Sequence, residues 1–197
     1  LNGYTADNRA GIFARRVAAV QVNFLGFSAT MGVPFMDYII GDQITIPSNQ
    51  KDNYSEKVIW MPDSFMPLDT LSKISSFPLS RRFYSLPEDS FVFCAFNNSY
   101  KIVPEQFNIW CQILKSVPES VLWLSATSEL AQVNLKVEAS KAGLEPNRII
   151  FSEFLDSRAD HLARYSLADL FLDTIPHNAH ATANDALVAG LPVLTCL

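Results

Sequence analysis

The chain has 197 residues, of which 49% are hydrophobic and 18% charged, with a formal net charge of −5. This composition is typical of a globular protein with a real core and excludes an intrinsically disordered chain. The acidic balance argues against sequence-independent binding of nucleic acid, which needs clustered Lys and Arg. No apolar run approaches the roughly 20 residues of a membrane span, and no signal peptide is visible.

The cysteines bear on the cellular location of the protein, and the chain ends bear on whether it is part of a longer one. Cys94, Cys111 and Cys196 are odd in number, widely spaced and form no C-x-x-C pair. Reduced thiols are therefore expected rather than disulfides, which favours a cytoplasmic location. Leu1 is not an initiator methionine, and Leu197 directly follows an apolar strand. We expect the chain to be a piece of a longer protein.

Residues 1–65 form a first block, with a turn and a helix that places Ile12, Phe13 and Val17 on one side. Two stretches of strand length follow at 20–27 and 36–40, separated by glycine and proline. Residues 66–90 are rich in proline and serine and show no sustained period. They are predicted to be a linker between domains.

Residues 91–197 form a second, more regular block. Apolar strands are predicted at 91–96, 121–126, 148–154, 170–174 and 191–196, and helices between them at 104–116, 128–142, 157–168 and 182–189. Strands that are apolar throughout and alternate with helices indicate a parallel sheet covered on both faces. This predicts a Rossmann-like lobe, whose ligands bind beyond the carboxyl ends of the strands. The loops from strand to helix are therefore the candidate site.

The first of these loops carries Lys101 just before a helix. A lysine there can reach a phosphate, to which the positive end of the helix adds its own attraction. A solvated surface lysine is the competing interpretation.

The loop after the third strand leads into a helix with Arg158, His161 and Arg164, which are spaced by three and so share one side of that helix. Arginine has a planar fork suited to phosphate, and His161 can donate to the same group. An ordinary solvated helix face remains the alternative.

The loop after the fourth strand contains His177 and His180 and then a helix start with Thr182 and Asp185. Backbone N–H groups at a helix start attract anions, and an acidic residue one turn further can accept hydrogen bonds from sugar hydroxyls. A plain helix cap is the competing interpretation. A metal pair is disfavoured because the two histidines have no obvious third ligand nearby and the H-E-x-x-H motif is absent. Together the three loops predict a nucleotide diphosphate ligand.

Other nucleotide and hydrolase motifs do not fit. The chain lacks G-x-x-x-x-G-K-[ST], which disfavours a P-loop kinase or ATPase, and it lacks G-x-G-x-x-G after any strand, which disfavours a nicotinamide dehydrogenase. Residues 26–30 nearly match a hydrolase nucleophile elbow but lack its final glycine.

Seven stretches in order resemble the O-linked N-acetylglucosamine transferase family, glycosyltransferase family 41, in its bacterial type. They are FMDYIIGDQ, YSEKVIWMPDSF, FNNSYKI, ILKSVPESVLWL, NRIIFSEF, LADLFLDT and HATANDALVAGLPVLT. The resemblance implies a GT-B enzyme of two Rossmann-like lobes, with residues 1–65 ending the N-lobe and 91–197 forming a truncated C-lobe that holds the sugar nucleotide. It also implies tetratricopeptide repeats upstream.

The resemblance also assigns roles to single residues. Lys101 matches the family's essential lysine, which contacts the donor diphosphate. The other matched donor-binding positions are Asn98, Arg158, His161, Arg164, His180, Thr182 and Asp185. Among these, Asn98 stands where the animal enzyme has Gln, and Arg158 replaces a lysine on the uracil side. Ala181 replaces the middle threonine of a His-Thr-Thr element, and Asp63 replaces a histidine near the cleft. His177 receives no role.

The resulting hypothesis is transfer of N-acetylglucosamine from UDP-GlcNAc to Ser or Thr hydroxyls of a protein or peptide acceptor, with inversion and without a metal or cofactor. Nucleic acid and membrane are not expected partners. Two alternatives stay open. Family relatives transfer fucose from GDP or glucose from UDP, and a non-catalytic module that only binds nucleotide sugars would carry the same residues.

Overall fold

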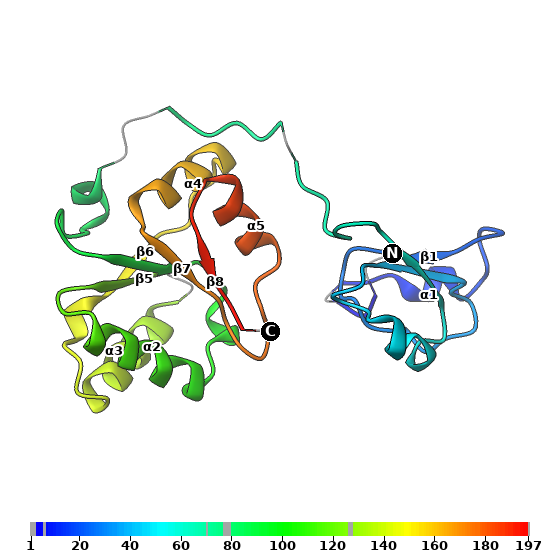
Figure 1. The fold of residues 1–197 in the computed structure, drawn as a ribbon, viewed down its shortest axis with the longest axis horizontal. Helices are drawn as coiled ribbons and strands as arrows, with labels where there is room; N and C mark the ends of the chain where they lie inside the picture. The colour runs from blue at the N-terminus through cyan, green and yellow to red at the C-terminus, as the bar shows by residue number, and fades with distance from the viewer. Residues whose placement is uncertain (1–2, 6, 70, 77–79, 126–127, 197) are drawn as a thin grey trace. The chain divides into compact units, whose positions relative to one another are not determined.

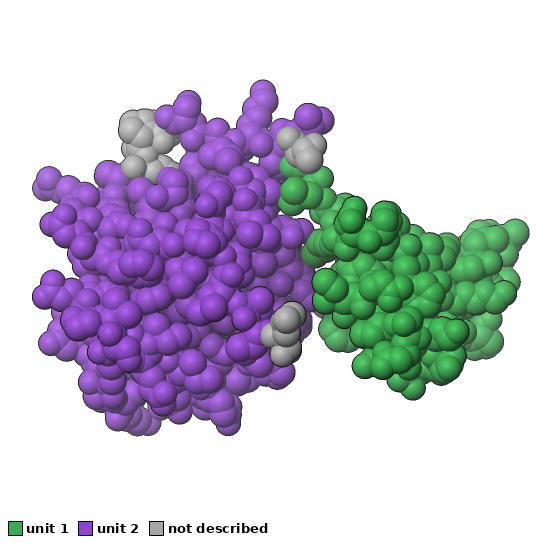
Figure 2. Space-filling model, in the orientation of Figure 1, with its two compact units in different colours: residues 1–69 green, residues 70–197 purple. Residues whose placement is uncertain are grey.

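The computed structural model describes the chain except residues 1–2, 6, 70, 77–79, 126–127 and 197. The chain divides into two compact units, residues 1–69 and 70–197 (Figure 2).

Unit 1 is built on a small parallel sheet in the order β1-β2-β3, with β1 at Val22–Asn23, β2 at Tyr38–Gly41 and β3 at Lys57–Trp60. A short helix α1 (Ala10–Phe13) precedes the sheet, and a 3₁₀ helix η1 (Ser48–Asn53) lies between β2 and β3. The predicted N-terminal helix is therefore much shorter than expected. It ends before Arg16, which takes a positive φ of 51° and pairs with Asp37 at 2.9 Å.

Unit 2 carries five parallel strands in the order β6-β5-β4-β7-β8 (Figure 1). Their bounds are β4 Val92–Ala95, β5 Val121–Ser125, β6 Ile149–Ser152, β7 Leu170–Leu172 and β8 Val193–Leu194. The helices are α2 Pro104–Ser116, α3 Glu129–Lys141, α4 Arg158–Arg164 and α5 Ala181–Val188, with 3₁₀ turns η2 Arg81–Tyr84, η3 Ser99–Lys101, η4 Pro146–Arg148 and η5 Tyr165–Leu167. All five strands and four helices predicted for residues 91–197 are present. The predicted doubly covered parallel sheet is confirmed.

Alternating residues of the strands build a core on each face of this sheet. Phe93 and Ala95 of β4 point into the core under α2 and α3, whereas Val92 and Cys94 point into the core under η5 and α5. A strand sends successive side chains to opposite faces, so a strand buried on both faces is apolar throughout. Figure 1 shows the two helix pairs on opposite sides of the sheet.

Part of the segment predicted as a linker belongs to unit 2. Leu86 is 4% exposed and lies in the core beneath η2. Arg81 pairs with Asp169 at 2.9 Å and donates to the carbonyl of Leu167. These contacts could not be predicted from hydrophobic periodicity, because they join an irregular segment to the turn before β7.

Cys94 and Cys111 are buried, Cys196 is exposed, and all three are free thiols. Within the described part of the chain, no helix is long and apolar enough to cross a membrane.

Candidate functional site

The site follows from where the chain reverses direction in the sheet of unit 2. From β4 the chain winds outward through β5 and β6, then returns to place β7 and β8 on the other side of β4. The loops after β4 and β7 therefore diverge, and open parallel sheets bind ligands in the crevice at such a point. These are the loops that carry Lys101 and His180.

Asp185 joins α5 to α4 through two residues predicted for the site. Its Oδ1 lies 2.8 Å from Nη2 of Arg158, and its Oδ2 lies 3.4 Å from Nε2 of His161. Burial would raise the pKa of Asp185, but the hydrogen bonds from His161 and Arg158 hold that pKa below its ordinary value. The structure thus brings these three side chains together around one carboxylate that stays ionised.

Arg164 differs from its predicted place on an open helix face. It is 3% exposed, and its guanidinium carbon lies 4.1 Å from the centre of the Phe96 ring. Its Nη1 donates to the hydroxyl of Ser152 and the carbonyl of Glu153. The helix closes against the end of β6 at this point, so the third residue of the spaced set lies beneath the surface rather than on it.

Arg164 also fixes the tautomer of His161. Its Nη2 lies 2.6 Å from Nδ1 of His161, and because arginine only donates, that nitrogen must be the acceptor. Nε2 therefore carries the proton and donates it towards Asp185. Arg164 acts on the site through His161.

Lys101 ends η3 and reaches the loop that follows β7. Its Nζ donates to the carbonyl oxygen of Asn178 at 3.1 Å. Burial lowers the pKa of Lys101, and nearby Asp173 acts in the opposite direction. The ammonium group is half-buried beside the loop, which is not the environment of a freely solvated surface lysine.

Asp173 holds that loop in place, a role that the sequence patterns did not reveal. It is 7% exposed and accepts from the backbone N–H of Thr174 at 2.7 Å and of Ala179 at 2.6 Å. It also accepts from the side chains of Asn178 at 2.9 Å and Thr195 at 2.6 Å. The one available signal was an acidic residue at the end of an apolar strand.

His180 and Thr182 lie at the start of α5. His180 is the residue just before the helix, and burial together with the charges of Lys101 and His177 lowers its pKa. The hydroxyl of Thr182 donates to Oδ1 of Asn97. The expected contact of this hydroxyl with a diphosphate is not available while it donates to Asn97, which leaves the backbone N–H groups of the first turn facing a ligand.

Three further residues named from the sequence make only local contacts or are exposed. Asn98 is exposed, and its side chain accepts from the N–H of Tyr100, which caps η3. The ring of His177 lies 6.3 Å from that of His180. Asp63 is exposed in unit 1. Among the residues that the structure describes, no three His, Cys, Asp or Glu side chains gather so as to hold a metal ion.

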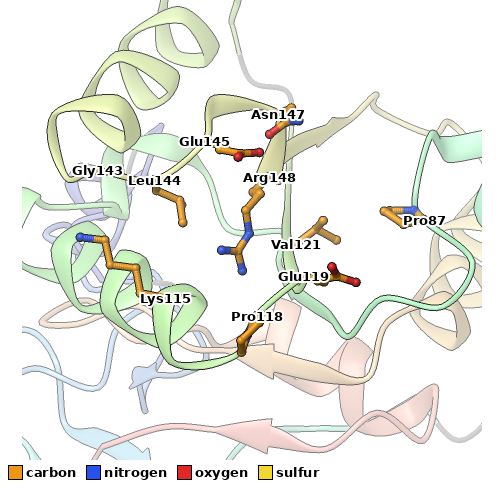
Figure 3. Close-up of a pocket in the computed structure, with 10 residues that line it drawn as sticks. All are labelled: Pro87, Lys115, Pro118, Glu119, Val121, Gly143, Leu144, Glu145, Asn147 and Arg148. Atoms are coloured by element: carbon orange, nitrogen blue, oxygen red, sulfur yellow. The ribbon is translucent and has the colours of Figure 1, made fainter.

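A pocket of about 550 Å³ lies at the opposite edge of the sheet, around the starts of β5 and β6 (Figure 3). Arg148, drawn in its middle, donates to the backbone carbonyls of Leu114, Val117 and Ser120. This arginine caps the end of α2. None of the predicted site residues lines this pocket.

The carboxyl edge of the sheet therefore offers two kinds of group. Lys101 and the start of α5 supply positive charge and backbone donors that suit a diphosphate. Asp185, oriented by Arg158 and His161, supplies an ionised acceptor that suits hydroxyl groups. A nucleotide diphosphate needs both.

Comparisons with known proteins relate the whole chain to one family. The profile of the glycosyl transferase family 41 matches residues 1–77 and 72–197. The chain is 39% identical to a probable UDP-N-acetylglucosamine–peptide N-acetylglucosaminyltransferase SEC of Arabidopsis thaliana, over 99% of the chain and 20% of that protein. It is 33% identical to a SPINDLY protein of Petunia hybrida with the same probable activity in its name, over 99% of the chain and 21% of that protein.

Among solved structures, a lysine-to-methionine mutant of the Thermobaculum terrenum O-GlcNAc transferase matches with a TM-score of 0.78 and 29% identity. That match covers 93% of this chain and 34% of the solved chain. The chain thus spans about a fifth of the length of the two curated relatives and a third of the solved one. The profile match over both segments, together with the parallel-sheet α/β fold, shows that the chain belongs to glycosyl transferase family 41.

Proposed function

We propose that the protein transfers N-acetylglucosamine from UDP-GlcNAc to Ser or Thr hydroxyls of a protein or peptide acceptor. The observation that carries this proposal is that two groups lie at the carboxyl edge of one sheet. One is Lys101 with the start of α5, and the other is the Arg158–His161–Asp185 cluster. The printed names of the SEC and SPINDLY relatives, which are probable N-acetylglucosaminyltransferases, support the choice of donor and acceptor.

The donor would lie across the carboxyl edge of the sheet. Its diphosphate faces Lys101 and the backbone N–H groups that begin α5, where the positive helix end favours an anion. The ribose hydroxyls donate to Asp185. The base lies against Arg158 and His161, which flank that carboxylate. His180 and Asn98 contribute to this surface from the loops after β7 and β4, and Thr182 contributes through its backbone in the first turn of α5.

Transfer with inversion requires the acceptor oxygen to attack the anomeric carbon opposite the diphosphate. A bond forms between that oxygen and that carbon as the bond from the carbon to the diphosphate breaks. UDP leaves with the electron pair, and the hydroxyl proton is released to solvent. The Lys101 ammonium neutralises charge on the departing UDP. Catalysis would then rest on positioning and on preorganised charge, without a metal or cofactor.

Lys101→Met tests this assignment directly. We expect glycosylation of an acceptor peptide by the full-length gene product to fall by at least about 100-fold, the scale on which a positioned charge acts in a transition state. The matched control is Lys115→Met, because Lys115 lines the pocket at the opposite edge of the sheet. A folded Lys101 variant with wild-type turnover would remove this lysine from the mechanism.

The remaining expectations stay predictions. We expect tetratricopeptide repeats upstream in the full-length protein, a cytoplasmic location, and no role for nucleic acid or membrane. The choice of donor is tested by measuring how well UDP, GDP and their sugar conjugates compete for binding. Binding of UDP-GlcNAc without turnover in the full-length protein would indicate the non-catalytic module instead.

A further inference from the structure

Asn97 lies where the two halves of the unit 2 sheet diverge, and no prediction from the sequence gave it a role. It lies two residues after Ala95, the last residue of β4, and is 3% exposed. Its Nδ2 donates to the hydroxyl of Thr174, in the loop after β7, at 3.0 Å. Its Oδ1 accepts from the hydroxyl of Thr182, in the first turn of α5. One buried amide therefore joins three segments of the candidate site.

The directions of these hydrogen bonds follow from the groups themselves. The hydroxyl of Thr174 lies 2.8 Å from the carbonyl oxygen of His177, which can only accept. The Thr174 hydroxyl donates its one proton to that carbonyl, so it can only accept from Asn97, which donates through Nδ2. Oδ1 of Asn97 then faces Thr182, whose hydroxyl must donate. These hydrogen bonds hold the buried Asn97 amide in one orientation, because rotating it would leave a buried polar group without its partner.

The segments that these hydrogen bonds join carry the groups proposed to hold the diphosphate. The loop from Thr174 to His180 includes Asn178, whose carbonyl receives the Lys101 ammonium. The first turn of α5 presents its backbone N–H groups. Asn97 sits between the two and contributes none of the charge itself, so its effect on a ligand acts through these neighbours.

We propose that Asn97 is a positioning residue that sets the distance between the Thr174–His180 loop and the start of α5, and with it the diphosphate-binding geometry. This inference rests on the proposed function, since it concerns the placement of the same donor. Small displacements of groups that position a reacting substrate cost about 100-fold in rate. We therefore expect Asn97→Ala to lower kcat and the affinity for UDP by about 10- to 100-fold while the protein remains folded.

The test is a double-mutant cycle of Asn97→Ala, Thr182→Val and the double variant in the full-length protein. UDP affinity is measured by calorimetry, turnover with UDP-GlcNAc and an acceptor peptide, and the free energy of unfolding by denaturant. Because the two side chains form one hydrogen bond, the double variant should bind UDP no worse than the weaker single variant. Thr182→Ser, which keeps the hydroxyl, should recover most of the affinity lost in Thr182→Val.

Asn108→Ala, at an exposed position of α2, serves as the matched control. Additive losses in the cycle, or a folded Asn97→Ala protein with wild-type UDP affinity and kcat, would overturn the positioning role. If Asn97→Ala does not fold, the ratio between Thr182→Val and Thr182→Ser decides, since a purely structural role predicts equal UDP affinity in the two. Failure of the wild-type protein to bind UDP would refute the proposed function instead, so the two failures are distinguishable.

Discussion

Asp185→Asn removes one charge at the centre of the candidate site while nearly keeping the side chain's shape. The wild-type carboxylate accepts from Arg158 at 2.8 Å and faces Nε2 of His161 at 3.4 Å. The amide of asparagine offers one oxygen, and its NH₂ group must face one of these two donors. The Arg158 side chain is 57% exposed, so its pair with Asp185 is worth only about 0–1 kcal/mol.

The larger loss is expected at His161, whose side chain is 20% exposed. A mostly buried donor left without an acceptor costs about 1–3 kcal/mol, and we expect the free energy of unfolding to fall by that amount. A hydrogen bond from a ribose hydroxyl to the charged carboxylate is worth about 1.5–3 kcal/mol. UDP should therefore bind about 10- to 150-fold more weakly.

The pH dependence of this variant gives an independent check. Because the pKa of Asp185 in the folded protein lies below its ordinary value, the carboxylate stabilises the fold above the unfolded pKa of about 3.9 and loses that effect as pH falls through the folded pKa. The stability difference between wild type and Asp185→Asn should therefore be present at neutral pH and shrink below about pH 4.

The assay is calorimetric titration of UDP into the full-length protein, with denaturant unfolding of the same samples. Asp156→Asn is the matched control, because this aspartate is exposed in the loop between β6 and α4. Its unfolding free energy should stay within about 0.5 kcal/mol of wild type. The reasoning is refuted if Asp185→Asn is folded and binds UDP as tightly as the wild-type protein.

Two further predictions concern the other loop and unit 1. Burial and the charges of Lys101 and His177 lower the pKa of His180, so an NMR titration should give a midpoint below about 6.5. Lys101→Met should raise that midpoint, and an unchanged value would place the lysine elsewhere. A Cβ at Gly41 would lie 2.6 Å from Cδ1 of Ile46, which is 0% exposed. Gly41→Ala should therefore destabilise unit 1 by about 1–3 kcal/mol in denaturant unfolding. At Gly11 a Cβ meets nothing within 4 Å, and an equal loss in Gly11→Ala would contradict the steric argument.

The regular half of the fold could be predicted from the sequence because burial there follows a simple period. Strands buried on both faces are apolar throughout, and α2 was predicted with the bounds that the structure has, 104–116. Unit 1 does not follow this rule. In β3 no residue is buried, and its side chains alternate between exposed and half-buried. The sequence of β3 therefore lacks the pattern of a core strand, and a strand at 57–60 could not be predicted from it.

The site divides in the same way. The proximity of Arg158, His161 and Asp185 follows from the topology, because they lie within helices that follow neighbouring parts of a parallel sheet. The burial of Arg164 could not be predicted, since charged residues are rarely buried unless paired. Its partners, Ser152 and the Phe96 ring, come from the ends of two other strands. The roles of Asn97 and Asp173 could not be predicted for a related reason, because their partners lie in loops that are distant in the sequence.

The most direct test of the account is calorimetric titration of the full-length protein with UDP-GlcNAc and, separately, with GDP-fucose. The account predicts saturable binding of UDP-GlcNAc that UDP competes away and that Asp185→Asn weakens about 10- to 150-fold. Preference for GDP-fucose would contradict the proposed donor. Binding of UDP-GlcNAc that neither Asp185→Asn nor Lys101→Met alters would contradict the location of the site at the carboxyl edge of this sheet.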